Sequence, residues 1–444
     1  MGIISIAAQL ILSLSILVVL HECGHFFPAK WFKTRVEKFY LFFNPGFSLF
    51  KKQIGETEYG IGWIPFGGYV KISGMIDESM DTEQMEQEPQ PWEFRSKPAW
   101  QRLVIMLGGV TVNFVLGFLI FAGMMWYWGE TYYNASDLKY GVVASELGKD
   151  LGIKDGDHII SIGDVKFERY NPGIISQEIV LNDPEALIVN REGKEIALPI
   201  PVDMAEKLTK YENKGVGLFA ARLPQRIAKV TGGAAKKAGM KAGDQIIEVN
   251  GINTFFLRDF SAALEGKKEE NVNFTVLRNE RDTLNLSATL SKKGELGIFN
   301  VLLDGFAPEQ KQKYSLGQAI PKGVDISYGF LTGQLKAFKQ MFAGKIKATD
   351  SLGSVFSIAK MFDESWNWEQ FWKITAMLSI LLGFFNLLPI PALDGGYVMF
   401  LIWEVVTGRK PNDKFMEYAT MVGFFILIGL MIFALGLDVS KWFK

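Results

Sequence analysis

Two of the three histidines in the chain are four positions apart, in the run His21-Glu22-Cys23-Gly24-His25. Imidazoles at positions i and i+4 share one face of a helix and can bind a single Zn²⁺ ion, and a glutamate beside the first imidazole can act as general base toward a metal-bound water. The run directly follows the uncharged segment from Ile3 to Leu20. A carboxylate at such a depth is costly unless it has a partner or a function. We therefore predict one zinc ion bound by His21 and His25, with Glu22 as the base; residues that merely cap the segment are the alternative.

A catalytic zinc site needs a third protein ligand, because three protein groups and one open position complete it. His158 is a poor candidate, since it lies in a repeated segment whose second copy has Gln245 at the equivalent position. Asp394 is the only acidic residue from 370 to 403, and it follows a long apolar stretch, as the two histidines do. Two apolar helices that run in the same direction would place these three side chains at one depth. We therefore predict Asp394 as the third ligand, with a role as helix cap as the alternative.

The segment around Asp394 also contains two helix-breaking residues. Pro389 and Pro391 lie between Asn386 and Asp394. Proline removes a backbone donor and clashes with the preceding turn, so the helix is interrupted and backbone carbonyls are left free. A broken helix at membrane depth suits a site that must hold a non-helical chain.

Four stretches without any charged residue could carry these side chains: Ile3 to Leu20, Leu103 to Gly129, Ile374 to Leu393 and Tyr418 to Leu437. Each is long enough, as a helix, to cross a hydrocarbon core of roughly 30 Å. We predict four transmembrane helices, in residues 1–27, 103–129, 371–405 and 417–438. The first could be a cleaved signal peptide, but it lacks a basic leading region and a small-residue cleavage site.

The basic residues near these spans predict their orientation. Lysines and arginines follow the first span and precede the second: Lys30, Lys33, Arg35, Lys38, Arg95, Lys97 and Arg102. Such residues favour the cytoplasmic side. We therefore expect the loop of residues 28–102 inside, both termini and the long stretch from about 130 to 373 outside, and the zinc site near the cytoplasmic side.

The composition of the chain argues against a nucleic-acid-binding protein and against a disulfide-stabilised one. The chain has 444 residues, of which 48% are hydrophobic, and a formal net charge of −1, so there is no sizeable basic surface for nucleic acid. Its single cysteine, Cys23, excludes an intramolecular disulfide. Cys23 is about 200° around the helix from His21 and is expected to face away from the metal.

The outer stretch contains an internal repeat. Residues 147–165 align without gaps on residues 234–252, with seven identities in nineteen positions. Each copy has a glycine-aspartate turn, a short strand and a second tight turn, which indicates two compact α+β domains, residues 134–220 and 221–308. The pattern resembles PDZ domains, which bind extended peptides in a groove. A spacer without peptide ligands is the alternative.

Three further segments remain. Residues 46–73 alternate and break at Gly55 and again from Pro65 to Gly68, which predicts three short strands that tuck into the helices as a membrane-reentrant sheet. Asp77 to Glu93 is acidic and predicts a solvated linker. Residues 315–370 form an amphipathic helical region that either lies along the outer membrane surface or packs on the bundle.

Together these motifs resemble the site-2 protease family, of the bacterial type that regulates sigma-E. The resemblance rests on HECGH after the first apolar segment, GFSLF and PFGGYVK in the following loop, FRSKPAWQR, the duplicated outer region and NLLPIPALDGG. It runs nearly end to end. It implies a polytopic α-helical membrane protein of the bacterial inner membrane, an intramembrane zinc metalloprotease that cuts single-span membrane proteins such as pre-trimmed anti-sigma factors.

The resemblance also implies roles for single residues. His21, His25 and Asp394 would hold the zinc and Glu22 would be the base. Asn386, with the hairpin around Gly67 and Gly68, would hold the substrate backbone, and the PDZ-like pair would exclude substrates with bulky outer domains. The family often has GPxxN in the second span, where this chain has Gly109-Val-Thr-Val-Asn113. We expect a monomer in the lipid bilayer, with a peptide-binding membrane scaffold or a zinc transporter as the alternatives to a protease.

Overall fold

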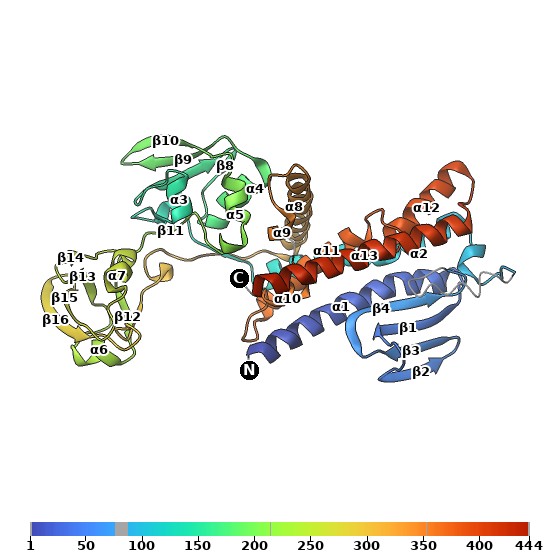
Figure 1. Ribbon diagram of the computed structural model, residues 1–444, viewed down its shortest axis with the longest axis horizontal. Coiled ribbons are helices and arrows are strands. Elements are labelled where there is room, and N and C mark those ends of the chain that lie inside the picture. Colours follow the sequence, from blue (N-terminus) through green and yellow to red (C-terminus); the bar gives the residue numbers. More distant parts are fainter. Residues whose placement is uncertain (1, 76–87, 214, 352, 443–444) are drawn as a thin grey trace. The chain divides into compact units, whose positions relative to one another are not determined.

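The computed structural model describes residues 2–75, 88–213, 215–351 and 353–442. Within it the chain forms two compact units. The helical unit comprises Met1–Gly129, Lys313–Leu335 and Leu352–Lys444, and the repeat unit comprises Glu130–Gln312 and Lys336–Ser351. Figure 1 shows the elements of both. Most of the acidic linker expected in residues 77–93, namely residues 77–87, lies outside the described residues.

Long helices make up most of the helical unit: α1 (Gly2–Trp31), α2 (Ala99–Tyr127), α11 (Trp368–Asn386), α12 (Asp394–Thr407) and α13 (Asp413–Trp442). Among the described residues, α1, α2 and the Lys414–Ser440 part of α13 are long and apolar enough to cross a membrane. The third expected span is two helices, because α11 ends at Asn386 and α12 begins at Asp394. The prolines between them account for this interruption. The expected count of four transmembrane helices is therefore not confirmed.

The helices of this unit pack closely around α2, which contacts α1, α11 and α12. Small residues permit the crossing of α1 and α2, since a Cβ atom added to Gly24 would lie 2.5 Å from the carbonyl oxygen of Gly108. Such close backbone approach is typical of helix pairs in membranes. Ile105 and Phe371 are fully buried in the resulting core.

A four-stranded sheet accompanies α1: β1 (Val36–Phe43), β2 (Phe50–Ile54), β3 (Thr57–Ile61) and β4 (Ile64–Ile72), in the order β2-β3-β1-β4. β1 pairs parallel with β3 and antiparallel with β4. The three strands expected in residues 46–73 are present, whereas β1 was not predicted. The expected break from Pro65 to Gly68 is wrong, because these residues lie within β4. Proline is tolerated in an edge strand such as β4, whereas a central strand excludes it.

The sheet packs against the helices. β4 lies along α1 (Figure 1), and a Cβ atom on Gly68 would be 2.6 Å from a methyl carbon of Val18. Val36 of β1 and Ile72 of β4 are buried in one cluster with Ala29 and Ile105. The sheet is thus held by burial of apolar side chains against α1 and α2.

The region that follows the repeats contains α8 (Leu316–Phe342), α9 (Ala348–Ser351) and α10 (Val355–Ala359). The part of α8 up to Leu335 belongs to the helical unit. There Ala319 is buried with Phe121 of α2 and Ile380 of α11. Of the two expected arrangements, the structure therefore has this part of α8 packed on the helices.

The repeat unit contains two copies of one arrangement. The first consists of β6 (Val142–Ala144), α3 (Glu146–Asp150), β7 (His158–Ile162), β8 (Val165–Lys166), α4 (Pro172–Asn182), β9 (Ala186–Arg191), β10 (Lys194–Pro199), α5 (Met204–Thr209) and β11 (Phe219–Ala221). The second consists of β12 (Ile227–Val230), α6 (Gly233–Lys237), β13 (Gln245–Val249), β14 (Ile252–Asn253), α7 (Leu257–Leu264), β15 (Asn271–Arg278), β16 (Asp282–Thr289) and β17 (Ile298–Asn300). Their four-stranded sheets have equivalent orders, β10-β9-β7-β8 and β16-β15-β13-β14. β5 (Glu130–Tyr132) pairs with β18 (Gln310–Gln312).

Equivalent ion pairs occur in the two copies of the repeat unit. Arg191 Nε donates to Asp157 Oδ1 over 2.8 Å, and Arg278 Nε donates to Asp244 Oδ1 over 2.8 Å. Each arginine also donates to the carbonyl oxygen of a glycine at the equivalent place in its repeat. Each copy has its own apolar core.

Candidate metal centre

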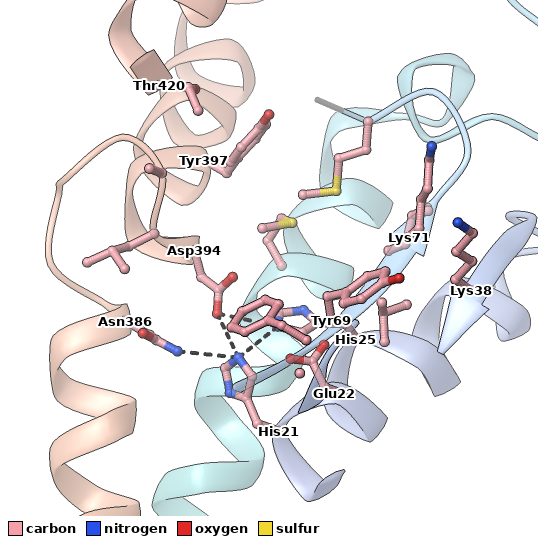
Figure 2. A pocket seen from close by; sticks show the side chains of 18 of the residues that line it. His21, Glu22, His25, Lys38, Tyr69, Lys71, Asn386, Asp394, Tyr397 and Thr420 are labelled. Carbon is pink, nitrogen blue, oxygen red and sulfur yellow. Dashed lines mark hydrogen bonds and ion pairs between the residues drawn. The ribbon is translucent and has the colours of Figure 1, made fainter. Parts of the chain in front are cut away.

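Three side chains of the helical unit converge on one point (Figure 2). His21 and His25 come from one face of α1, and Asp394 comes from the first turn of α12. His21 Nε2 and His25 Nε2 are 3.2 Å apart. Asp394 Oδ2 lies 3.4 Å from His21 Nε2 and 3.3 Å from His25 Nε2. The structure thus brings together residues almost 370 positions apart in the chain.

The size of this triangle fits a zinc ion. Ligand atoms 2.0–2.1 Å from a tetrahedral zinc are about 3.3–3.4 Å from one another, which matches all three sides. Asp394 Oδ2 is buried and makes no hydrogen bond of good geometry within the described residues. Such an orphaned oxygen is expected of a metal ligand. Two imidazoles and one carboxylate are also a donor set that zinc prefers.

His25 is held in the tautomer that metal binding needs. Its Nδ1 lies 2.9 Å from the carbonyl oxygen of Ile105 on α2. Because a carbonyl oxygen can only accept, the proton is on Nδ1, and Nε2 keeps its lone pair toward His21 and Asp394. This is the usual arrangement around metal-binding histidines.

Glu22 is placed beside the three converging groups. It lines the same cavity as His21 and His25, and Figure 2 shows its carboxylate next to their rings. The backbone N–H of Val70 on β4 donates to this carboxylate. β4 therefore holds Glu22 while leaving it close enough to the centre to exchange a proton with a water there.

The centre opens into a cavity of about 700 Å³. One wall is β4, from Gly68 to Ile72, and other walls include Asn386 and, from α13, Thr420. Asn386 Nδ2 lies 3.3 Å from His21 Nε2. Because β4 is at the edge of its sheet, its outer side is free of any described strand. The cavity thus has the edge strand β4 on one side and an amide side chain near the metal centre.

Gly109 of α2 makes room for the two rings. A Cβ atom at this position would lie 2.3 Å from His25 Nε2 and 2.7 Å from His21 Cε1. These distances are far below a normal non-bonded contact. The helix backbone of α2 therefore forms the floor of the metal centre, and only glycine fits there.

Most of the predicted site residues line this cavity. His21, Glu22, His25, Asn386, Gly68 and Asp394 do so, whereas Gly67 is not among the lining residues. Gly67 has φ +125° and lies against the ring of Phe43. His158 is on β7 of the repeat unit, and Cys23 is not among the described residues that line the cavity.

Several lining residues were not predicted from the sequence. Tyr69 and Lys71 of β4, Lys38 of β1, Tyr397 of α12 and Thr420 of α13 belong to this group. A regular alternation along β4 could have indicated which of its residues share a face. The positions of Tyr397 and Thr420 depend on how distant helices pack, for which the sequence has no local signal.

Comparisons with known proteins agree with this geometry. The sequence profile of peptidase family M50 matches residues 9–430. The chain is 28% identical to a protein of Rickettsia conorii named "Putative zinc metalloprotease", with 98% of each chain covered. It is 26% identical to the regulator of sigma E protease of Haemophilus influenzae, with 96% of each covered. It is 29% identical to a Vibrio cholerae protein with the same name as the Rickettsia protein, with 97% of each covered. The resemblance seen in the sequence is confirmed: the chain belongs to peptidase family M50, the site-2 protease family.

Proposed function

We propose that this protein is an intramembrane zinc metalloprotease that hydrolyses a peptide bond within or near the transmembrane segment of single-span membrane proteins. The observation that carries the proposal is the convergence of His21, His25 and Asp394 beside Glu22 in one cavity. Membership of peptidase family M50 and the names of the relatives confirm that the chain is a metalloprotease that uses zinc. The substrate class is our inference from the resemblance to the family and from the position of the cavity beside α1, an apolar helix long enough to cross a membrane.

In this proposal His21, His25 and Asp394 hold the zinc. When bound, zinc would polarise the scissile carbonyl and would make a water acidic enough to attack at neutral pH. Glu22, whose side chain lines the same cavity as the three ligands, would accept a proton from the attacking water and pass it to the leaving amine. The Val70 N–H keeps Glu22 oriented during the transfer.

The substrate must be extended before it can be cut, because the backbone of a helix is shielded by its own hydrogen bonds. Unwinding in lipid leaves N–H and C=O groups without partners, at several kcal/mol each. The outer side of β4, which pairs with no described strand, can supply some of these partners by strand addition. Asn386, on the other side of the metal centre, can hold the backbone of the same segment. A substrate mimic bound as an intact helix away from β4 would contradict this part of the proposal.

The proposal also includes the membrane topology, the role of the repeats and the substrates. The basic residues around residues 28–102 favour a metal centre near the cytoplasmic side of a bacterial inner membrane, with the repeat unit and both termini outside. The two repeats, as PDZ-like domains, would exclude substrates with bulky outer domains or bind peptides. Anti-sigma factors trimmed outside the membrane are then suitable substrates, with the protease acting as a monomer in regulated intramembrane proteolysis.

The proposal is tested by cleavage of a single-span test substrate by wild-type protein and Glu22→Gln, with zinc content measured in both. We expect Glu22→Gln to retain zinc and to lose at least about 100-fold in rate, in line with the loss of a general base. Cys23→Ala, a change at the next position of α1, is the control and should retain zinc and activity. Unchanged cleavage by Glu22→Gln would reject Glu22 as the base. Zinc binding without any cleavage by wild-type protein would favour a transporter or a scaffold.

A further inference from the structure

Asn113 is a buried polar residue in the middle of α2, and none of its surface is exposed. Its Nδ2 atom lies 2.9 Å from His21 Nδ1. Its Oδ1 atom is buried and has no hydrogen-bond partner among the described residues. Burial of an amide inside an apolar helix bundle costs free energy. A role for the contact between Asn113 and the His21 ring would account for that cost.

The tautomer of His21 supplies that reason. His21 Nε2 faces Asp394 and His25, so this nitrogen must keep its lone pair when a metal is bound. The ring proton is then on Nδ1, and the ring donates toward Asn113. An amide nitrogen cannot accept this hydrogen bond, but the amide oxygen can, after the side chain turns by 180°. In either orientation of the Asn113 amide, one end faces His21 and the other end has no described partner. The tautomer of the His21 ring therefore decides whether the nitrogen or the oxygen of the amide faces the ring.

The backbone of Asn113 is held in place by a neighbouring helix. Ser379 of α11 donates from its hydroxyl to the carbonyl oxygen of Asn113 over 2.7 Å. Gly383, one turn further along α11, allows Asn113 to pack there, since a Cβ atom on Gly383 would be 3.3 Å from Asn113 Cβ. Asn113 therefore lies at a point where α1, α2 and α11 meet.

We propose that Asn113 is a positioning residue for the metal centre: its amide oxygen accepts the Nδ1 proton of His21 and holds the Nε2 lone pair toward the zinc. Together with the carbonyl oxygen of Ile105, which accepts from His25, it places both imidazoles in the same tautomer. This inference rests on the proposed function, because it assumes that His21 and His25 bind zinc through Nε2. It assigns Asn113 a role through His21 and no contact with substrate.

The test measures zinc affinity, by competition with a chelator, of full-length protein in detergent. Asn113→Leu has a similar volume but cannot accept, and we expect it to bind zinc about 10–100-fold more weakly, the usual effect of removing such a partner. Asn113→Asp can accept, and we expect its affinity within about threefold of wild type. If Asn113→Leu does not fold, Asn113→Ala replaces it, because a smaller side chain cannot overfill the site.

A matched control separates positioning from stability. Ser13→Ala removes another buried interhelical hydrogen bond, in which Thr375 Oγ1 donates to Ser13 Oγ over 2.9 Å, without touching an imidazole. We expect Ser13→Ala to retain wild-type zinc affinity. Equal affinity of Asn113→Leu and wild type, or equal losses in Asn113→Leu and Asn113→Asp, would overturn the inference. If the proposed function itself is wrong, wild-type protein and His21→Ala would have the same weak zinc affinity. This result distinguishes failure of the proposed function from failure of the inference about Asn113.

Discussion

Gly109→Ala is expected to abolish zinc binding while leaving the helix intact. The added Cβ atom would be 2.3 Å from His25 Nε2. Non-bonded atoms of this kind settle at about 3.5 Å or more, so the ring would have to retreat by about 1.2 Å. Metal ligands tolerate displacements of only about 0.2 Å. The rings can rotate away from the methyl group, but then Nε2 no longer points at the metal, and we expect zinc affinity to fall by at least about 100-fold.

The assay is zinc content after gel filtration, together with chelator competition, on purified protein in detergent. Gly123→Ala is the matched control, because Gly123 lies on the same helix and a Cβ atom there would meet nothing within 4 Å. It should bind zinc as wild type does. Wild-type zinc affinity in Gly109→Ala would refute the placement of the two imidazoles against α2. Equal losses in both variants would show that alanine in α2 acts on the fold and not on the rings.

Three further outcomes are expected. His158→Gln should leave one equivalent of zinc per chain, because this histidine lies in the repeat unit; loss of zinc would contradict the ligand set. Gly423→Ala should lower stability by about 1–3 kcal/mol, measured by thermal unfolding, because its Cβ atom would be 1.4 Å from the carbonyl oxygen of Pro391. Burial raises the pKa of Asp244, but hydrogen bonds from Arg278 and a backbone N–H outweigh it and lower this pKa overall. The pair therefore stabilises the second repeat above a pH of about 3.9, and this stability is lost as the pH falls through the lowered pKa. Arg278→Gln removes most of this contribution, so the second repeat should resist protease less well at neutral pH and should lose less further resistance on acidification.

Two of these outcomes have internal controls. Gly429 lies on α13 as Gly423 does, but a Cβ atom added there would meet nothing within 4 Å. Gly429→Ala should therefore leave the unfolding temperature nearly unchanged. In Arg278→Gln the first repeat, whose Arg191 and Asp157 the substitution does not touch, should keep its wild-type protease resistance. An unchanged second repeat, or an equal loss of protease resistance in both repeats, would reject the assigned role of Arg278.

Much of the metal centre could be predicted from local patterns. The spacing of His21 and His25 places both on one helix face because 3.6 residues make one turn, whatever the rest of the chain does. Asp394 could be selected because an acid within an apolar segment is rare and costly. The two repeats could be recognised because each copy keeps its own turn residues and buried ion pair. These features depend on neighbours close in the chain.

Other features arise from contacts between distant segments. β1 lies between β3 and β4, and its parallel pairing with β3 has no local signal, so Val36–Phe43 could not be recognised as the centre of the sheet. The meeting of Asn113 with His21 depends on how α1 and α2 cross, and that crossing is set by glycines on both helices. Periodicity and composition identify which residues are able to do chemistry. Packing of helices and sheet edges establishes which of them meet, because burial and hydrogen bonding are settled among all segments at once.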